Sequence, residues 1–166
     1  IRTKIKEIIG ELEDSKKNLY TDNCILNSVL NIKYSAAQVA DIKIESNIFV
    51  PKYMNIDYGD MGVLFGNLLD NAIEANQGVD RKKRWINVSV KYEEHILIIN
   101  IKNSKIRGSR RKKKGYLNHG IGLNSVKQIV EKFNGIVEVQ DFGEMYEVSA
   151  ILYGICDDKD LGKSVL

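Results

Sequence analysis

The chain has 166 residues, of which 25 are basic and 22 acidic, and its formal charge is +3 at pH 7. This length fits one domain with a sizeable core, and so small a net charge does not by itself indicate a nucleic-acid or membrane partner. Cys24 and Cys156 match no zinc-ligand spacing, so we expect two reduced thiols. The longest apolar runs are far shorter than the roughly 20 residues that cross a bilayer, and the N-terminal residues lack a signal-peptide pattern.

The N-terminal segment, Ile1 to about Tyr20, carries apolar residues at helical spacing among lysines and glutamates. This pattern predicts an amphipathic helix with a narrow apolar stripe. Two placements of that stripe remain open: it packs on its own domain, or it joins a bundle with a helix upstream of Ile1. Because the chain begins inside such a helix and without Met, we expect a fragment of a longer protein.

A second helix is predicted after Thr21-Asp22-Asn23, whose side-chain oxygens can cap it, and we expect this helix to end near Ala40. Alternating apolar residues from Ile42 then predict a strand that stops by Pro51.

A third helix is predicted from about Asp57 to Asn76, with Gly78 as its C-cap. Three glycines inside it each cost up to about 1 kcal/mol relative to Ala, so we expect a close backbone approach along them: Gly59, Gly62 and Gly66. The side of this helix opposite its apolar residues carries two amides and two carboxylates: Asn67, Asp70, Asn71 and Glu74. Such oxygen ligands could hold a hydrated Mg²⁺ beside a phosphate, whereas the alternative is a solvated face.

A β-hairpin is predicted from Ile86 to about Asn103, with its turn at Glu93-Glu94. Its second run starts at His95 and is apolar on both faces at first, which favours an interior strand. We expect His95 to be a surface residue without a chemical role.

The stretch from Ser104 to Asn118 is rich in lysine and arginine and has no usable periodicity. Three interpretations remain open: a lid over an anionic ligand, a nucleic-acid patch or a solvated loop. Tyr116 is the only aromatic residue in this run, which weakens the nucleic-acid interpretation.

The sequence His119-Gly-Ile-Gly-Leu123 precedes a helix predicted to end at Asn134-Gly135. Glycines at a helix N-terminus let backbone N–H groups approach a phosphate. Two strands follow, Ile136 to Asp141 and Tyr146 to Tyr153, and a polar tail from Asp157 is expected to fray.

Two of these motifs together resemble the GHKL ATPases, the superfamily of gyrase, Hsp90, MutL and histidine kinases. Asn67 to Ala75 resembles the N-box, and His119 to Leu123 resembles the second glycine box. The subgroup that the chain resembles most is the sensor histidine kinases of Gram-positive quorum sensing, citrate-type and virulence signalling. In that subgroup a Thr-x-Asn, a Leu and a Lys precede the domain, and the matching residues here are Thr21, Asn23, Leu26, Leu30 and Lys33.

The resemblance implies an α/β two-layer sandwich in which a mixed, mostly antiparallel sheet of about five strands packs against three helices, after an N-terminal helical arm. We therefore expect residues 1–20 to be the C-terminal part of a dimerisation helix or a linker. Residues 21–156 would form the GHKL ATP-binding catalytic domain, and residues 157–166 a polar tail.

The resemblance also implies roles for individual residues. Asn71 would coordinate the Mg²⁺ that bridges the ATP phosphates, and Asn67 would lie beside the same phosphates. The second glycine box would bind the phosphates through two backbone N–H groups and the imidazole, and its leucine would anchor the lid: Gly120, Gly122, His119 and Leu123. Asn103 stands where most members carry an Asp that accepts a hydrogen bond from the adenine amino group, and its amide oxygen can accept the same bond.

Two departures from the family pattern have consequences. Glu74 stands where many kinases carry a Lys or Arg, so the positive charge would come from Arg110 to Lys114. Asn67 replaces the glutamate that activates water in the hydrolytic branches, so we expect poor steady hydrolysis.

The implied function is the ATP-binding catalytic domain of a two-component sensor histidine kinase, an enzyme that uses ATP and Mg²⁺. The acceptor histidine would lie upstream of Ile1, so this fragment would not phosphorylate itself. The implied partners are the dimerisation and phospho-acceptor helices of the same kinase, a response regulator and, in the full-length protein, a second copy. We expect no contact with nucleic acid or membrane, and a cytoplasmic location in a membrane-anchored bacterial sensor.

Two alternatives belong to other classes. A GHKL anti-sigma-type serine kinase has the same boxes, although the amphipathic arm from Ile1 argues against it. A non-enzymatic domain would bind nucleotide, or would bind nucleic acid through the basic loop.

Overall fold

A computed structural model describes residues 18–108 and 121–161 of the chain. The main helices of this part are α2 (Cys24–Val39), α3 (Tyr58–Asn76) and α4 (Ile121–Lys132). The strands are β1 (Lys43–Phe49), β2 (Trp85–Glu93), β3 (Ile96–Ser104), β4 (Ile136–Asp141) and β5 (Met145–Tyr153), and two short helices are η1 (Arg81–Lys83) and α5 (Asp158–Leu161).

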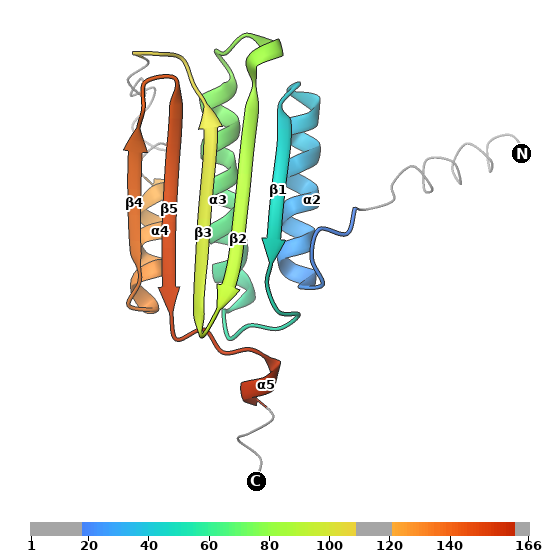
Figure 1. Ribbon diagram of the computed structural model, residues 1–166, viewed down its shortest axis with the longest axis vertical. Coiled ribbons are helices and arrows are strands. Elements are labelled where there is room, and N and C mark those ends of the chain that lie inside the picture. Colours follow the sequence, from blue (N-terminus) through green and yellow to red (C-terminus); the bar gives the residue numbers. More distant parts are fainter. Residues whose placement is uncertain (1–17, 109–120, 162–166) are drawn as a thin grey trace, which may run out of the picture.

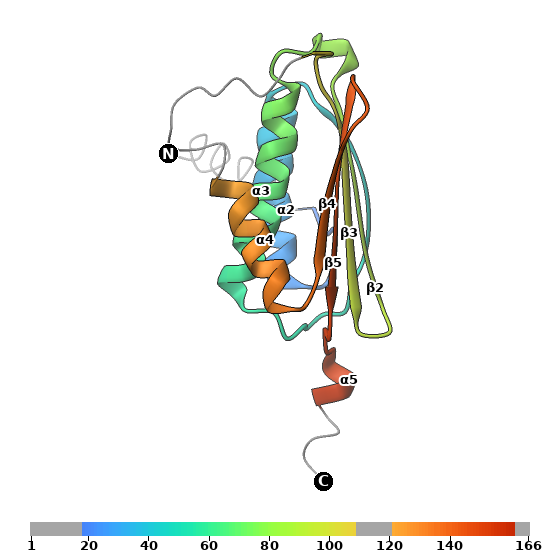
Figure 2. The same ribbon diagram turned by 90° about the vertical axis from the view of Figure 1, so that its left-hand side faces the viewer.

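These five strands form one sheet in the order β1-β2-β3-β5-β4 (Figure 1). β1 and β2 are parallel, and each of the other neighbouring pairs is antiparallel. Figure 2 shows that α2, α3 and α4 all lie on one face of the sheet. The predicted α/β two-layer sandwich is therefore confirmed. The predicted helical arm lies outside the described residues, apart from residues 18–20, which are not helical.

The alternating pattern of the strands decides which side chains enter the core. In β2 the residues Ile86, Val88 and Val90 face the helices and are at most 1% exposed. β3 is the third of the five strands, as its apolar start predicted. Phe65 of α3 is the largest fully buried side chain, and it packs in the core between the sheet and the helices.

The starts of α2 and α3 follow the capping signals of the sequence. Asn23 caps α2, and its Oδ1 accepts a hydrogen bond from the backbone N–H of Leu26 at 3.0 Å. Asp57 caps α3 in the same way, accepting from the N–H of Gly59 at 2.8 Å. Because these caps are local contacts, the sequence predicted both helix starts correctly.

The ends of the same two helices share one side chain. Arg84 donates to the carbonyl oxygen of Ala40 at 2.7 Å and to that of Gln77 at 3.1 Å, which are the C-cap residues of α2 and α3. It also donates to the carbonyl oxygen of Val79 at 2.9 Å. A cation at two helix C-termini satisfies their terminal carbonyls and interacts favourably with both helix dipoles.

Two of the glycine predictions were wrong. The C-cap of α3 is Gln77 rather than Gly78, and a Cβ at Gly78 would lie 2.3 Å from Cδ1 of Ile106. Gly78 thus makes room for a packed isoleucine. Gly62, where we expected a close backbone approach, has no neighbouring atom within 4 Å of an added Cβ in the described part of the chain.

The first residues of the predicted tail, 157–161, have regular structure rather than a frayed one, whereas residues 162–166 lie outside the described residues. Ile155 is fully buried, and Asp157 forms a β-bridge with Met54 before α5 begins. Cys24 and Cys156 are both free thiols, as expected. No helix in residues 18–108 or 121–161 is both long and apolar enough to cross a membrane.

Candidate nucleotide site

The polar side of α3 divides between its two neighbouring helices. Asp70 turns toward α2, where Nζ of Lys33 donates to both of its carboxylate oxygens at 2.7 Å. Asn67 lies between the two neighbouring helices: it lines the same pocket as Lys33 and Asp70, and it also lies beside Gly122 of α4. The carboxylate of Asp70 is therefore already engaged in an ion pair at the surface.

Asn67 of α3 and Gly122 of α4 are in contact. A Cβ added to Gly122 would lie 3.4 Å from Oδ1 and 3.5 Å from Cγ of Asn67. Asn67 and Gly122, one residue from each of the two motifs, thus lie side by side at the first turn of α4. The N–H groups of a first helical turn have no intrahelical acceptor and favour an anion.

Asn71 follows Asn67 by one turn of α3. Its Nδ2 is buried and has no hydrogen-bond partner within the described residues. A buried amide left without a partner costs about 1–3 kcal/mol, so such a group fits a site that a bound ligand completes. The amide chemistry of Asn71 therefore fits the predicted phosphate and Mg²⁺ site.

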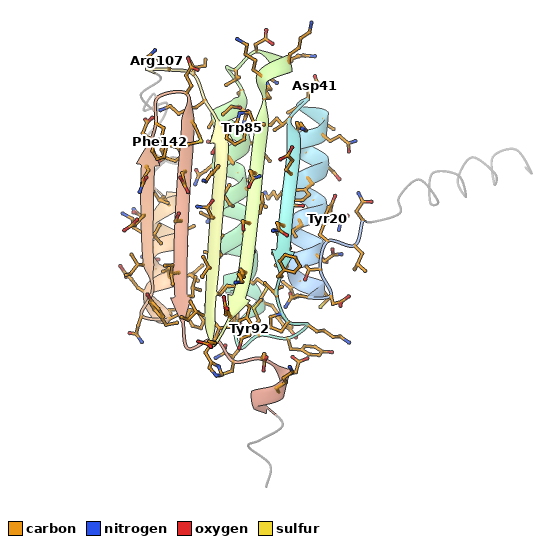
Figure 3. The ribbon with its side chains drawn as sticks, viewed as in Figure 1. Tyr20, Asp41, Trp85, Tyr92, Arg107 and Phe142 are labelled. Atoms are coloured by element: carbon orange, nitrogen blue, oxygen red, sulfur yellow. The ribbon has the colours of Figure 1, made fainter. Side chains whose placement is uncertain are left out.

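The side chain of Asn103 lies on the helix-covered face of β3, near the C-terminal end of α3. It is 2% exposed, and its Nδ2 donates to the carbonyl oxygen of Ser104 at 3.0 Å. Trp85, which starts the neighbouring strand, and Arg107 lie at this same end of the sheet, whereas Tyr92 lies at the opposite end (Figure 3).

Two polar residues beside Asn103 were not singled out from the sequence. Ser104 Oγ donates to Oδ1 of Asn76 at 2.5 Å and accepts from the backbone N–H of Trp85 at 3.0 Å. Ser104 is 5% exposed and Asn76 is fully buried. The only sequence signal was that both are polar residues at the ends of apolar runs, where a helix or strand normally stops.

A buried cation also lies near this end of β3. Lys105 has a 9% exposed side chain, forms an ion pair with Asp141, and its Nζ lies 5.9 Å from the ring centre of Tyr146. The hydrogen bonds from Lys105 and from the N–H of Gly143 lower the pKa of Asp141.

The other residues singled out from the sequence lie in different parts of the chain. Leu123 is half-buried and packs against the core. His119, Gly120 and the run Arg110 to Lys114 lie outside the described residues. His95 is exposed in the β2–β3 turn, where its Nδ1 lies 3.2 Å from the carbonyl oxygen of Ile155, at the end of the sheet opposite Asn103.

The described residues contain no group of three or more His, Cys, Asp or Glu side chains placed to hold a metal ion. A cation at the α3–α4 contact would therefore need amide oxygens and the oxygens of its ligand. Such a set suits Mg²⁺, which usually keeps substrate phosphates and waters among its ligands.

Comparison with known proteins agrees with this geometry. A family model described as "GHKL domain" matches residues 56–152. A Bacillus subtilis (strain 168) protein named probable C4-dicarboxylate sensor kinase is 32% identical over 95 residues, which make up 51% of this chain and 18% of that relative. The chain thus spans 18% of the length of the curated relative that it matches.

Solved structures share the fold at low identity. The catalytic domain of histidine kinase ThkA superposes with a TM-score of 0.62 at 15% identity, over 80% of this chain and 91% of that one. The mycobacterial sensor histidine kinase MprB gives 0.60 at 19% identity, over 78% of this chain and 93% of that one. Full-length ShkA in complex with AMPPNP gives 0.61 at 14% identity, over 81% of this chain and 30% of that one.

Proposed function

Because this chain belongs to the GHKL domain family, we propose that it is the ATP-binding catalytic domain of a two-component sensor histidine kinase. The observation that carries the proposal is the position of Asn67 beside Gly122, one turn from Asn71, whose Nδ2 has no partner among the residues that the structure describes. The proximity of Asn67 and Gly122 brings together the two motifs that we propose to bind phosphate. The sensor-kinase relative and the shared fold of histidine kinase catalytic domains support the same assignment.

In this proposal the side chains and the backbone divide the binding of ATP between them. Asn71 and Asn67 bind the phosphate end, with Asn71 also supplying an oxygen to Mg²⁺. Gly120 and Gly122 donate backbone N–H groups to the phosphates, His119 donates from the edge of the site, and Leu123 anchors the basic lid to the body. Asn103 accepts from the adenine amino group. Bound Mg²⁺ would neutralise charge on the phosphates.

The acceptor imidazole would come from a dimerisation helix outside this chain. Transfer breaks the bond between the γ-phosphorus and the ADP oxygen and forms a bond to the imidazole nitrogen, so the domain contributes mainly orientation and charge. His95 does not fit the acceptor role, since it lies in a turn held against Ile155. We propose further that the parent protein is a membrane-anchored bacterial sensor of the Gram-positive quorum-sensing or virulence type, which dimerises and serves a response regulator.

Titration with a fluorescent ATP analogue, with and without Mg²⁺, tests the proposal. Asn71→Ala should weaken Mg²⁺-dependent binding at least about tenfold, which corresponds to the loss of roughly 1.4 kcal/mol. Asp70→Ala is the matched control on the same helix, because its carboxylate is already paired with Lys33 of α2. It should change the affinity by less than about twofold. Absence of binding by the wild-type chain, or equal affinities of wild type and Asn71→Ala, contradicts the proposal.

Incubation of the chain alone with γ-labelled Mg-ATP tests the place of the acceptor. We expect no stable label on the fragment. Stable label on His95 or His119 would show that the acceptor lies within this chain.

A further inference from the structure

The amide of Asn103 can act in two opposite ways toward a purine base. Its Oδ1 accepts a hydrogen bond and its Nδ2 donates one. With the oxygen outward, the side chain suits the exocyclic amino group of adenine, and with the nitrogen outward it suits the carbonyl oxygen of guanine. Which base it favours therefore depends on what fixes the orientation of the amide.

The carbonyl oxygen of Ser104 fixes that orientation. Nδ2 of Asn103 donates to it at 3.0 Å, and the Asn103 side chain is 2% exposed. A carbonyl oxygen has no proton to donate, so the reversed amide would place two acceptors against each other. The Oδ1 of Asn103 consequently points away from Ser104.

The Ser104 carbonyl is itself held in place. It belongs to the same planar peptide unit as the N–H of Lys105, and that N–H donates to the carbonyl oxygen of Glu144 at 2.9 Å. The Lys105 side chain also pairs with Asp141 on β4. Rotating the Ser104 carbonyl would break a hydrogen bond to the β4–β5 hairpin.

The side chain of Ser104 ties this peptide unit to α3. Its Oγ donates to Oδ1 of Asn76 at 2.5 Å, while Nδ2 of Asn76 donates to the carbonyl oxygen of Ala72 at 2.9 Å. Because Asn76 is fully buried, its amide has one orientation that satisfies both bonds. Ser104 thus joins two sets of hydrogen bonds: its hydroxyl bonds to Asn76 of α3, and its backbone carbonyl accepts from Asn103.

We propose that Ser104 and Asn76 are positioning residues that hold Asn103 with its oxygen toward the ligand, so that the site selects adenine over guanine nucleotides. This inference rests on the proposed function. An amino group on the base completes the hydrogen bond, whereas the guanine carbonyl oxygen would oppose Oδ1 of Asn103. A fixed amide can therefore discriminate between adenine and guanine, whereas an asparagine that turns freely could hydrogen-bond to either base.

Displacement of a bound fluorescent ATP analogue by ATP and by GTP tests the inference. The wild-type chain should prefer ATP by at least roughly tenfold, the effect of one well-formed against one opposed hydrogen bond. Ser104→Ala should lower this preference about fivefold, and Ser104→Thr, which keeps the hydroxyl, should restore it. Ser149→Ala is the matched control, since this serine accepts from Asn100 at 2.8 Å on the opposite face of the sheet.

The ratio of the two affinities separates positioning from a general structural role. A structural role would weaken ATP and GTP alike in Ser104→Ala and leave the ratio unchanged. Mg²⁺-dependent ATP binding with an unchanged ratio overturns the inference alone, as does a wild-type chain that binds both nucleotides equally. Absence of nucleotide binding by the wild type overturns the proposed function and this inference together.

Discussion

Gly122, in the first turn of α4, lies against Asn67 of α3, and a Cβ at position 122 would stand 3.4 Å from the Asn67 Oδ1. That separation is ordinary van der Waals contact, so the fold itself tolerates a methyl group there. In the proposed function, the absence of a side chain lets the first-turn N–H groups of α4 and the amide of Asn67 approach the same ligand. Packing alone therefore does not require a glycine at position 122, and we attribute it to the proposed phosphate site.

Gly122→Ala should separate binding from stability. We expect the affinity for a fluorescent ATP analogue to fall at least about tenfold, equivalent to roughly 1.4 kcal/mol, because the added methyl fills the space beside Asn67. The melting temperature should stay near that of the wild type. Gly62→Ala is the control: nothing described lies within 4 Å of its Cβ, so it should stabilise α3 by about 0.5–1 kcal/mol and leave binding unchanged. Wild-type affinity in Gly122→Ala would contradict the assignment.

Arg84→Ala should destabilise the fold more than any neighbouring basic substitution. The guanidinium satisfies the terminal carbonyls of two helices, and its loss should lower the free energy of unfolding by about 2–3 kcal/mol. Arg81→Ala removes only an exposed ion pair with Asp41 and should cost less than about 0.5 kcal/mol. Urea unfolding monitored by circular dichroism compares the two variants, and equal midpoints would show that the shared cap contributes nothing.

Gly135→Ala should be far more damaging than Gly78→Ala. A Cβ at Gly135 would lie 2.1 Å from the backbone oxygen of Ile151, which cannot move without shifting β5. At Gly78 the near atom is the flexible end of Ile106, 2.3 Å away. We expect losses of about 3 kcal/mol or more for Gly135→Ala and about 1 kcal/mol for Gly78→Ala. Thermal unfolding of the two variants measures the difference, and a smaller loss at Gly135 would contradict the predicted clash.

Tyr34 should make stability depend on alkaline pH. Burial raises its pKa from 10.0 to about 12, so between these values the unfolded chain releases a proton that the folded chain retains. The unfolded state is then favoured as pH rises, and stability should fall from about pH 10 toward pH 12, by roughly 2–3 kcal/mol from this residue. Tyr34→Phe should lose less stability over the same range. Identical pH profiles would show that Tyr34 does not titrate differently on unfolding.

The sequence predicted the elements well because their signals are local. Asn23 and Asp57 cap helices through hydrogen bonds to residues two or three positions away, and a run that is apolar on both faces identified β3 as an interior strand. Asn67 and Asn71 were identified on one side of α3 by helical periodicity alone. The ligand-binding role inferred for that side depended on a second motif, His119 to Leu123. Helical periodicity does not relate this motif to the first.

Only the tertiary structure decided which polar side chains are neighbours, because this depends on which helices and strands pack side by side. Asp70 pairs with Lys33 because α2 lies on one side of α3, whereas Asn67 meets Gly122 because α4 lies on the other. The bond between Asn76 and Ser104 joins residues 28 positions apart. Helical periodicity assigns a residue to a face but carries no information about the neighbour of that face. The sequence by itself therefore determined the helices, the strands and the two motifs, and the packing of α2 and α4 around α3 decided which polar residues lie next to one another.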